Sequence, residues 1–178
     1  MLVYRGCKPK EDFLMGILGY YRKGVLSSMD SVDIKILNYL KENARQKASS
    51  ISEEINLSVS AVLERIRKLE NSGVIKKYTM VLDRKKIGYD MLAFIEVGLE
   101  HPKYYDNFTE EVLRNKQILS CHYITGDFDF ILQVLTNSSD GLEAVHREIK
   151  SIPGVSTTKT QFVLSTIKEE YTVIPETE

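Results

Sequence analysis

The sequence has few of the features that mark membrane proteins or disulfide-rich proteins. Only two of its 178 residues are cysteines, Cys7 and Cys121, so neither a dense disulfide framework nor a paired-cysteine zinc or redox motif can form. The longest nearly uninterrupted apolar run, 13–21, has nine residues, whereas a membrane helix needs about twenty. We therefore expect an intracellular, cytoplasmic protein that does not contact a membrane.

The motifs of common catalytic and nucleotide-binding sites are also absent. No nucleophile elbow, Walker loop, dinucleotide-binding glycine pattern or HExxH zinc motif occurs. The histidines have no cysteine or carboxylate at metal-ligand spacing, and the side chains of neighbouring Cys121 and His122 would point to opposite faces of a strand. We therefore expect no enzymatic activity, no catalytic residue, no metal site and no cofactor.

The charged residues are distributed unevenly along the chain. The net charge of −1 combines +3 over residues 1–29, +4 over 30–86 and −8 over 87–178. Residues 58–86 alone carry 8 basic and 3 acidic groups. A basic front and an acidic back indicate one module that meets a polyanion and a second module with a different task.

Helical periodicity predicts three helices in the basic part of the chain. They cover 30–43, 48–55 and 58–71, and a serine at position 49 or 50 is the predicted cap of the second helix. Asn56 can adopt the left-handed conformation that a tight turn between the second and third helices requires. This arrangement is typical of a helix-turn-helix domain. The next segment, 74–82, is predicted to form a wing or a linking strand.

The third helix has an outward face suited to DNA. Small and basic side chains stand opposite its apolar stripe, with Leu63 and Arg65 on the flanks; the outward residues are Ser60, Ala61, Glu64, Arg67 and Lys68. Lys76 and Lys77 add a basic pair in the strand that follows. A solvated helix face would show the same pattern, so this alternative stays open.

The acidic part of the chain reads as a second, α+β domain. Strands are predicted at 91–99, 118–125, 128–136 and 155–167, with helices at 104–114 and 138–150. The order βαββαβ is the ferredoxin-like signature, with one antiparallel sheet and both helices on one face. The other face is expected to expose Val, Ile, Leu and Phe side chains, which favours self-association.

One turn of this second domain has the character of a ligand site. In 124–129, Gly126 would let the backbone approach a ligand, and Asp127 and Asp129 could hold an ammonium group. A tight hairpin that contains aspartate would look the same.

Two blocks of sequence resemble the Lrp/AsnC (feast/famine, leucine-responsive) transcriptional regulators. The first block comprises 30–37, 57–58 and 65–79, and the second comprises Thr125-Gly126-Asp127-Phe128-Asp129 and Pro153-Gly154-Val155 with Thr158 and Thr160. The resemblance covers 29 to about 170. Because both blocks occur in order and at suitable spacing, chance is an improbable explanation.

The resemblance implies a winged helix-turn-helix domain on double-stranded DNA, followed by a ferredoxin-like (ACT-like, RAM) effector domain. It also implies homodimers, further assembly into homo-octamers, and a small amino-acid effector bound between subunits. Together with the charge pattern, it predicts as DNA-binding residues Ser58, Ser60, Ala61, Glu64, Arg65, Arg67, Lys68, Lys76 and Lys77. The predicted effector-binding residues are Gly126, Asp127, Phe128, Asp129, Thr158 and Thr160.

The expected organisation is therefore an extension of unclear role at 1–28, a DNA-binding domain at 29–80, a linker at 81–90 and an effector and oligomerisation domain at 91–178. One alternative is a ligand-independent, architectural DNA-binding regulator whose second domain serves only assembly.

Overall fold

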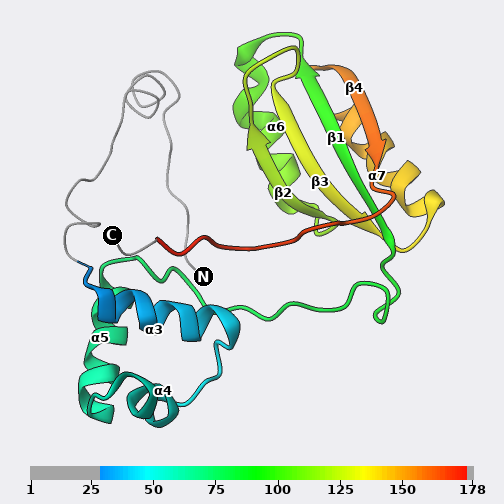
Figure 1. Ribbon diagram of the computed structural model, residues 1–178. Coiled ribbons are helices and arrows are strands. Elements are labelled where there is room, and N and C mark those ends of the chain that lie inside the picture. Colours follow the sequence, from blue (N-terminus) through cyan, green and yellow to red (C-terminus); the bar gives the residue numbers. More distant parts are fainter. Residues whose placement is uncertain (1–28, 176–178) are drawn as a thin grey trace. The chain divides into compact units, whose positions relative to one another are not determined.

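The computed structural model describes residues 29–175, which form two compact units (Figure 1). Among the described residues, the first unit comprises 29–80 together with 170–175, and the second comprises Val81–Glu169. The segment 170–175, which the sequence placed with the second domain, thus lies with the first unit. The predicted extension 1–28 falls outside the described residues.

The first unit is a three-helix bundle. Its helices are α3 (Ser31–Glu42), α4 (Ala48–Ile55) and α5 (Val59–Asn71), within two residues of the predicted bounds. All three helices contribute to one core, whose buried members are Ile36, Leu37, Ile51, Val62 and Leu69. Because each helix buries only one face, the other face of each is left to solvent.

The caps explain where these helices begin. Asp30 caps α3 in a capping box with Asp33, and Ser58 caps α5 by accepting the backbone N–H of Ala61 at 3.2 Å. The predicted serine cap of α4 is wrong. Lys47 occupies the N-cap position and provides no side-chain hydrogen bond, so α4 depends on its packing against α3 and α5 more than on its cap.

The strand predicted at 74–82 is also absent from the described structure. No ladder hydrogen bonds are assigned over these residues, and the side chains of Tyr78, Met80, Val81 and Leu82 are 47 to 78% exposed. A strand needs a neighbour to satisfy its N–H and C=O groups. This single chain offers the segment no partner strand.

The second unit is a four-stranded antiparallel sheet with two helices. Its elements are β1 (Met91–Leu99), the short 3-10 helix η1 (Pro102–Tyr104), α6 (Tyr105–Arg114), β2 (Ile118–Tyr123), β3 (Phe130–Thr136), α7 (Ser139–Ser151) and β4 (Val155–Phe162). The strand order is β2-β3-β1-β4, which confirms the ferredoxin-like prediction. Strand β4 ends five residues earlier than predicted, because only Val155 to Phe162 pair with β1.

Both helices pack on the same face of this sheet (Figure 1). Phe108 and Val112 of α6 and Leu142, Val145 and Ile149 of α7 are buried against β1 and β3, as predicted. Leu113, which was predicted to belong to the apolar pattern of α6, is 83% exposed.

The opposite, open face is less apolar than expected. The valines of β1 and β3 do not lie on it, because Val97 and Val134 are fully buried on the helix side. In the middle of the open face, Glu96 pairs with Lys159 at 3.4 Å and accepts a hydrogen bond from Gln161 at 3.1 Å. Leu92 and Leu135 lie on this face but are buried, at 7% and 9% exposure, and Phe94 and Ile131 are half-buried, so the predicted exposure of leucine is wrong.

Candidate DNA-binding surface and effector region

The turn between α4 and α5 sets the direction of α5. Asn56 ends α4 with φ 54° and ψ 46°, the left-handed conformation predicted for it, and the only positive φ of a non-glycine residue in 29–175. Asparagine tolerates this conformation better than residues with longer or branched side chains. Two residues later Ser58 starts α5, so the second and third helices form a compact helix-turn-helix.

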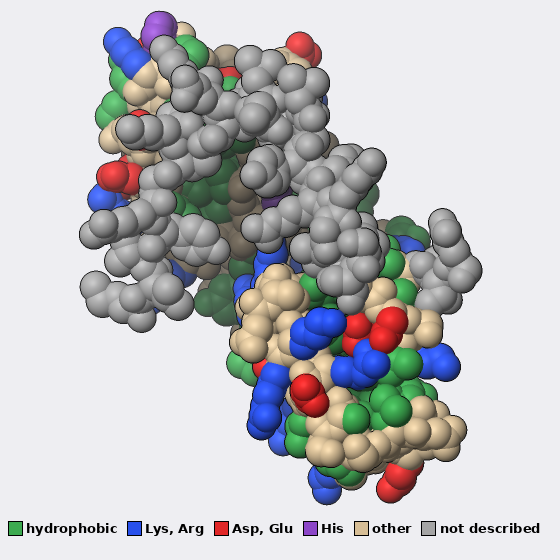
Figure 2. Space-filling view, turned by 90° about the vertical axis from the view of Figure 1, so that its left-hand side faces the viewer, with side chains coloured by type: hydrophobic (Ala, Val, Ile, Leu, Met, Phe, Trp, Pro, Cys, Tyr) green, Lys and Arg blue, Asp and Glu red, His purple; other side chains and the backbone are tan. Residues whose placement is uncertain are grey.

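The outward face of α5 carries the predicted DNA-facing residues. Ser60, Glu64, Arg67 and Lys68 are exposed and Ala61 is half-buried, while Val62 and Leu69 on the opposite side are buried. Ser58 also has a structural task, because its hydroxyl caps the helix and lies 3.0 Å from that of Ser60. Figure 2 shows Lys and Arg side chains interspersed with hydrophobic ones on the three-helix unit.

Arg65 is placed differently from the other predicted DNA-binding residues. Its Nη1 donates to Oδ1 of Asp33 at 2.7 Å and to the carboxylate of Asp30 at 2.8 Å. Hydrogen bonds to Asp33 and then to Asp30 raise the pKa of the guanidinium further. The Asp33 carboxyl is 2% exposed, so Arg65 compensates a buried charge and ties α5 to the start of α3.

The basic pair Lys76 and Lys77 follows α5 in the extended segment and is exposed. The neighbouring Tyr78 hydroxyl donates to Oε1 of Glu70 at 2.9 Å. Burial and this hydrogen bond raise the pKa of Tyr78 to about 12. The tyrosine thus holds the beginning of the basic segment against the last turn of α5.

The predicted effector turn lies between β2 and β3. Its ends are joined by the hydrogen bond from Ile124 N–H to the carbonyl of Asp129 at 2.8 Å. Oδ2 of Asp129 accepts the backbone N–H of Leu99 at 2.7 Å, which ties the turn to the end of β1. Gly126 has φ 128°, Asp127 is exposed and Phe128 is half-buried. Asp129 therefore has a structural role, and Asp127 is the carboxylate that faces solvent.

Thr158 and Thr160 lie on β4, which β1 separates from β3. Their partners across the ladder are Val97 and Ile95, so both threonines are on the helix side of the sheet. The Thr158 hydroxyl is 3.0 Å from Nε2 of His146 on α7. Within one chain, both threonines thus lie on β4, whereas the turn joins β2 to β3. The Thr158 hydroxyl is already used in a contact with α7.

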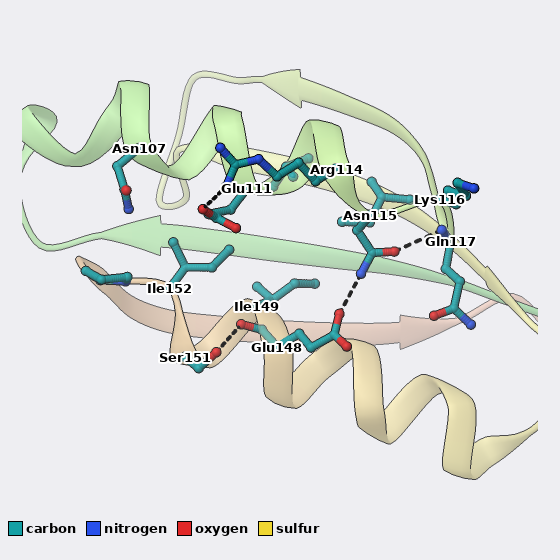
Figure 3. A pocket seen from close by; sticks show the side chains of 13 residues that line it. Asn107, Glu111, Arg114, Asn115, Lys116, Gln117, Glu148, Ile149, Ser151 and Ile152 are labelled. Carbon is teal, nitrogen blue, oxygen red and sulfur yellow. Dashed lines mark hydrogen bonds and ion pairs between the residues drawn. The ribbon is translucent and has the colours of Figure 1, made fainter.

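Sequence reasoning missed a cavity of about 670 Å³ between α6 and α7 (Figure 3). Its floor includes Val112, Ile149 and Ile152. At its rim, Glu111 pairs with Arg114 at 2.6 Å, and Asn115 donates to Glu148 at 2.7 Å across the groove. Because Asn115 and Glu148 are 33 residues apart along the sequence, no local motif predicts the cavity.

Cys121 and the histidines are the other potentially reactive side chains of the described residues. Within 29–175, no group of three or more His, Cys, Asp or Glu residues could hold a metal ion. Cys121 and His122 are paired with Leu132 and Ile131 and so point to opposite faces, as predicted. Burial raises the pKa of the Cys121 thiol to about 11, which keeps it protonated and unreactive at neutral pH. No helix of this part of the chain is long and apolar enough to cross a membrane.

Comparison with protein families gives two matches, one for each unit. Residues 29–76 match a winged helix-turn-helix DNA-binding domain, and residues 92–173 match the Lrp/AsnC ligand binding domain. The first match contains the whole outward face of α5. The second contains the turn 124–129 and both threonines of β4.

Individual proteins are similar over nearly their whole length. The chain is 38% identical over 141 residues to the HTH-type transcriptional regulator FL11 of Pyrococcus horikoshii, covering 79% of this chain and 93% of the relative. It is 30% identical over 152 residues to the leucine-responsive regulatory protein of Escherichia coli, covering 84% and 93%.

Solved structures of transcriptional regulators also match this chain. A transcriptional regulator of Neisseria meningitidis in complex with L-methionine matches with a TM-score of 0.79 at 30% identity, covering 82% of this chain and 96% of that one. A feast or famine regulatory protein of Mycobacterium tuberculosis complexed with L-methionine matches with a TM-score of 0.76 at 26% identity, covering 82% and 99%.

Proposed function

Since the chain belongs to the Lrp/AsnC family and is a DNA-binding transcriptional regulator of that type rather than an enzyme, we propose that it binds a specific operator through α5 and responds to a small amino acid. The observation that carries the DNA part is the outward face of α5, where Arg67 and Lys68 stand behind the small residues Ser60 and Ala61. Small residues let the helix approach base edges, and of the two basic residues behind them Arg67 can reach base edges while Lys68 binds a phosphate. Because the proposed target is duplex DNA, we also propose that the protein acts in the cytoplasm.

The proposed DNA-binding residues divide by task. Ser60, Glu64 and Arg67 contact base edges, whereas Lys68, Lys76 and Lys77 bind phosphates, and Ser58 and Ala61 allow close approach. Arg65 supports this surface from behind through Asp33. A dimer would present two copies of α5 about one helical turn of DNA apart, so the operator is an approximate palindrome.

Fluorescence anisotropy tests this part. The full-length protein is titrated with duplexes selected from a random pool, over a salt series, as wild type, Lys68→Ala and Lys150→Ala. Losing one phosphate contact reduces the slope of log K against log salt by about 1. Lys150 is an exposed lysine of α7 and serves as the matched control. Equal effects of the two substitutions, or no selected sequence at all, would contradict the proposal.

Self-association is the second part of the proposal. Phe94 and Ile131 on the open sheet face are half-buried, and Met80, Val81 and Leu82 are at least half exposed in a segment without a strand partner. We propose that a second copy covers the sheet face and pairs with 78–82, which forms a dimer, and that dimers assemble further into octamers. Sedimentation velocity checks this, and a monomer at micromolar concentration would be evidence against it.

The effector is proposed to be a small amino acid bound near the turn 124–129 of neighbouring subunits. The exposed Asp127 is suited to an ammonium group, and relatives of the family bind L-methionine in solved structures. A panel of amino acids at saturating concentration should contain at least one that raises the melting temperature of the wild type but not of Asp127→Ala. If no amino acid shifts it, the alternative of a ligand-independent architectural regulator is favoured.

A further inference from the structure

Two exposed apolar side chains distinguish α5 from the other helices of the first unit. Val59 is 42% exposed and Leu63 is 41% exposed. No other large apolar side chain of α3, α4 or α5 is exposed in the described structure. A single exposed leucine would need no explanation. Here, however, both exposed side chains belong to the helix that is proposed to enter the DNA groove.

Val59 and Leu63 are neighbours on the surface of α5. Residues four positions apart lie one above the other on a helix. The same spacing places Arg67 one turn beyond Leu63, and Ser60 lies directly beside Val59. Val62 and Leu69 of α5 belong to the core cluster, whereas Val59 and Leu63 are neither in it nor among the partly buried side chains packed against it. The two apolar side chains therefore border the polar outward face and do not close the bundle core.

The chemistry of the major groove offers a suitable partner. Among the four base pairs, only A·T and T·A present an apolar group there, the C5-methyl group of thymine. Phosphates and the other base edges are polar and would gain nothing from contact with valine or leucine. Arg67 on the same face is proposed to contact base edges, which would position the apolar pair within the groove.

We infer that Val59 and Leu63 form an apolar pair that contacts a thymine C5-methyl group in each operator half-site. This inference rests on the proposed function, because it assumes that α5 lies in the major groove. It adds a specificity-determining contact that the charge pattern of the helix does not reveal. Each half-site should contain at least one thymine whose methyl group contributes to affinity.

Deoxyuridine substitution tests the inference, because deoxyuridine pairs like thymidine and lacks only the methyl group. The selected duplex is prepared with each thymine of one half-site replaced in turn, and binding of the full-length protein is measured by anisotropy. At one or two positions the wild type should lose affinity about fourfold, as expected for one methyl group returned to water.

The variant Leu63→Ala completes a double-mutant cycle. It should bind the thymine duplex about fourfold more weakly than wild type, and deoxyuridine at the sensitive position should then cause no additional loss. Leu113→Ala, which shortens a leucine that is 83% exposed on α6, is the matched control and should bind like wild type. Unchanged melting temperatures would show that both variants fold.

The outcomes separate the inference from the proposed function. A selected operator whose binding is weakened by Lys68→Ala but is insensitive to deoxyuridine at every position would overturn the inference and leave the proposed function standing. Equal sensitivity of the wild type and Leu63→Ala to deoxyuridine would also overturn the inference. If the selection yields no preferred sequence, both are wrong.

Discussion

Nη1 of Arg65 in α5 lies 2.7 Å from Oδ1 of Asp33 in α3, and this ion pair joins two helices whose contact orients the candidate DNA-binding surface. Asp33 is 2% exposed, whereas the side chain of Arg65 is 31% exposed. The carboxylate is therefore the buried partner, and the guanidinium neutralises it from the rim. The pair is a structural contact within the DNA-binding unit.

Arg65→Met should therefore lower the stability of the three-helix unit by about 2 kcal/mol, because a buried carboxylate loses a charged hydrogen-bond donor. Arg67→Met removes a guanidinium that has no ion-pair partner among residues 29–175, so it should weaken DNA binding with little effect on stability. Hydrogen exchange of the α5 amides measures the first effect and anisotropy the second. Equal protection factors in the two variants would show that the pair contributes nothing to stability.

The contrast between these two arginines shows what local patterns can and cannot predict. The helices, their order and the left-handed Asn56 follow from local patterns within a few residues and are confirmed, whereas the serine cap predicted for α4 is wrong. The projection of α5 correctly separates Arg67 from the core. It cannot identify the partner of Arg65, because Asp33 lies 32 residues away and only the packing of α3 on α5 brings the two together.

The second unit shows the same limit. Its strand order follows from the βαββαβ pattern, but the extent of β4 depends on where β1 stops offering hydrogen-bonding partners. The β-prone segment 74–82 has no partner strand in this chain and forms no strand. In the effector region, the sequence identified the turn but not that Asp129 is used to hold Leu99. That the predicted site residues bind DNA or an effector stays a prediction.

The capping carboxylate of Asp30 makes the first unit sensitive to acid. Hydrogen bonding to the backbone N–H of Asp33 and then to Arg65 lowers the pKa of Asp30 below its ordinary value of 3.8. Since the folded protein has the lower pKa, the unfolded chain binds more protons near that pH. The contribution of this carboxylate is therefore fully present above about pH 5 and decreases as the pH falls through the folded-state pKa.

Asp30→Asn retains a good N-cap residue and removes the titrating group. We expect its melting temperature to fall less steeply than that of the wild type between pH 5 and pH 2. Thermal unfolding followed by far-ultraviolet circular dichroism, in buffers of constant ionic strength, gives the comparison. Parallel curves would mean that other carboxylates account for the acid sensitivity.

Gly154 combines a left-handed backbone with a close aromatic neighbour. Its φ is +91°, and a Cβ atom there would lie 2.1 Å from Cγ of Tyr104. Gly88 in the same unit has φ +80° but no neighbouring atom within 4 Å of its Cβ position. Gly88→Ala should therefore cost about 1 kcal/mol from backbone strain alone, whereas Gly154→Ala should cost at least twice as much. Urea unfolding measures both, and equal losses would contradict the predicted clash.

A double substitution separates the clash from the strain at Gly154. In Gly154→Ala with Tyr104→Gly, the new methyl group meets neither the ring nor the Cβ atom of Tyr104, which would otherwise lie 2.5 Å from it. The effects of the two single substitutions should therefore not add, and the double variant should be more stable than their sum predicts. Strict additivity would show that Tyr104 moves aside without cost.

The segment after Glu170 completes the three-helix unit. Ile174 is half-buried against the core that contains Ile36 and Leu37, and Glu170 pairs with Lys41 of α3 at 3.0 Å. Because the pair is largely exposed, its contribution is small, and most of the stabilisation comes from the apolar contact.

Ile174→Ala should therefore destabilise the unit by about 1 kcal/mol. Val173, which is 89% exposed, provides the control Val173→Ala. Faster exchange of the α3 amides in Ile174→Ala alone, with β1 amides unchanged, is the expected result, and identical exchange in both variants would show that the segment does not stabilise the helices.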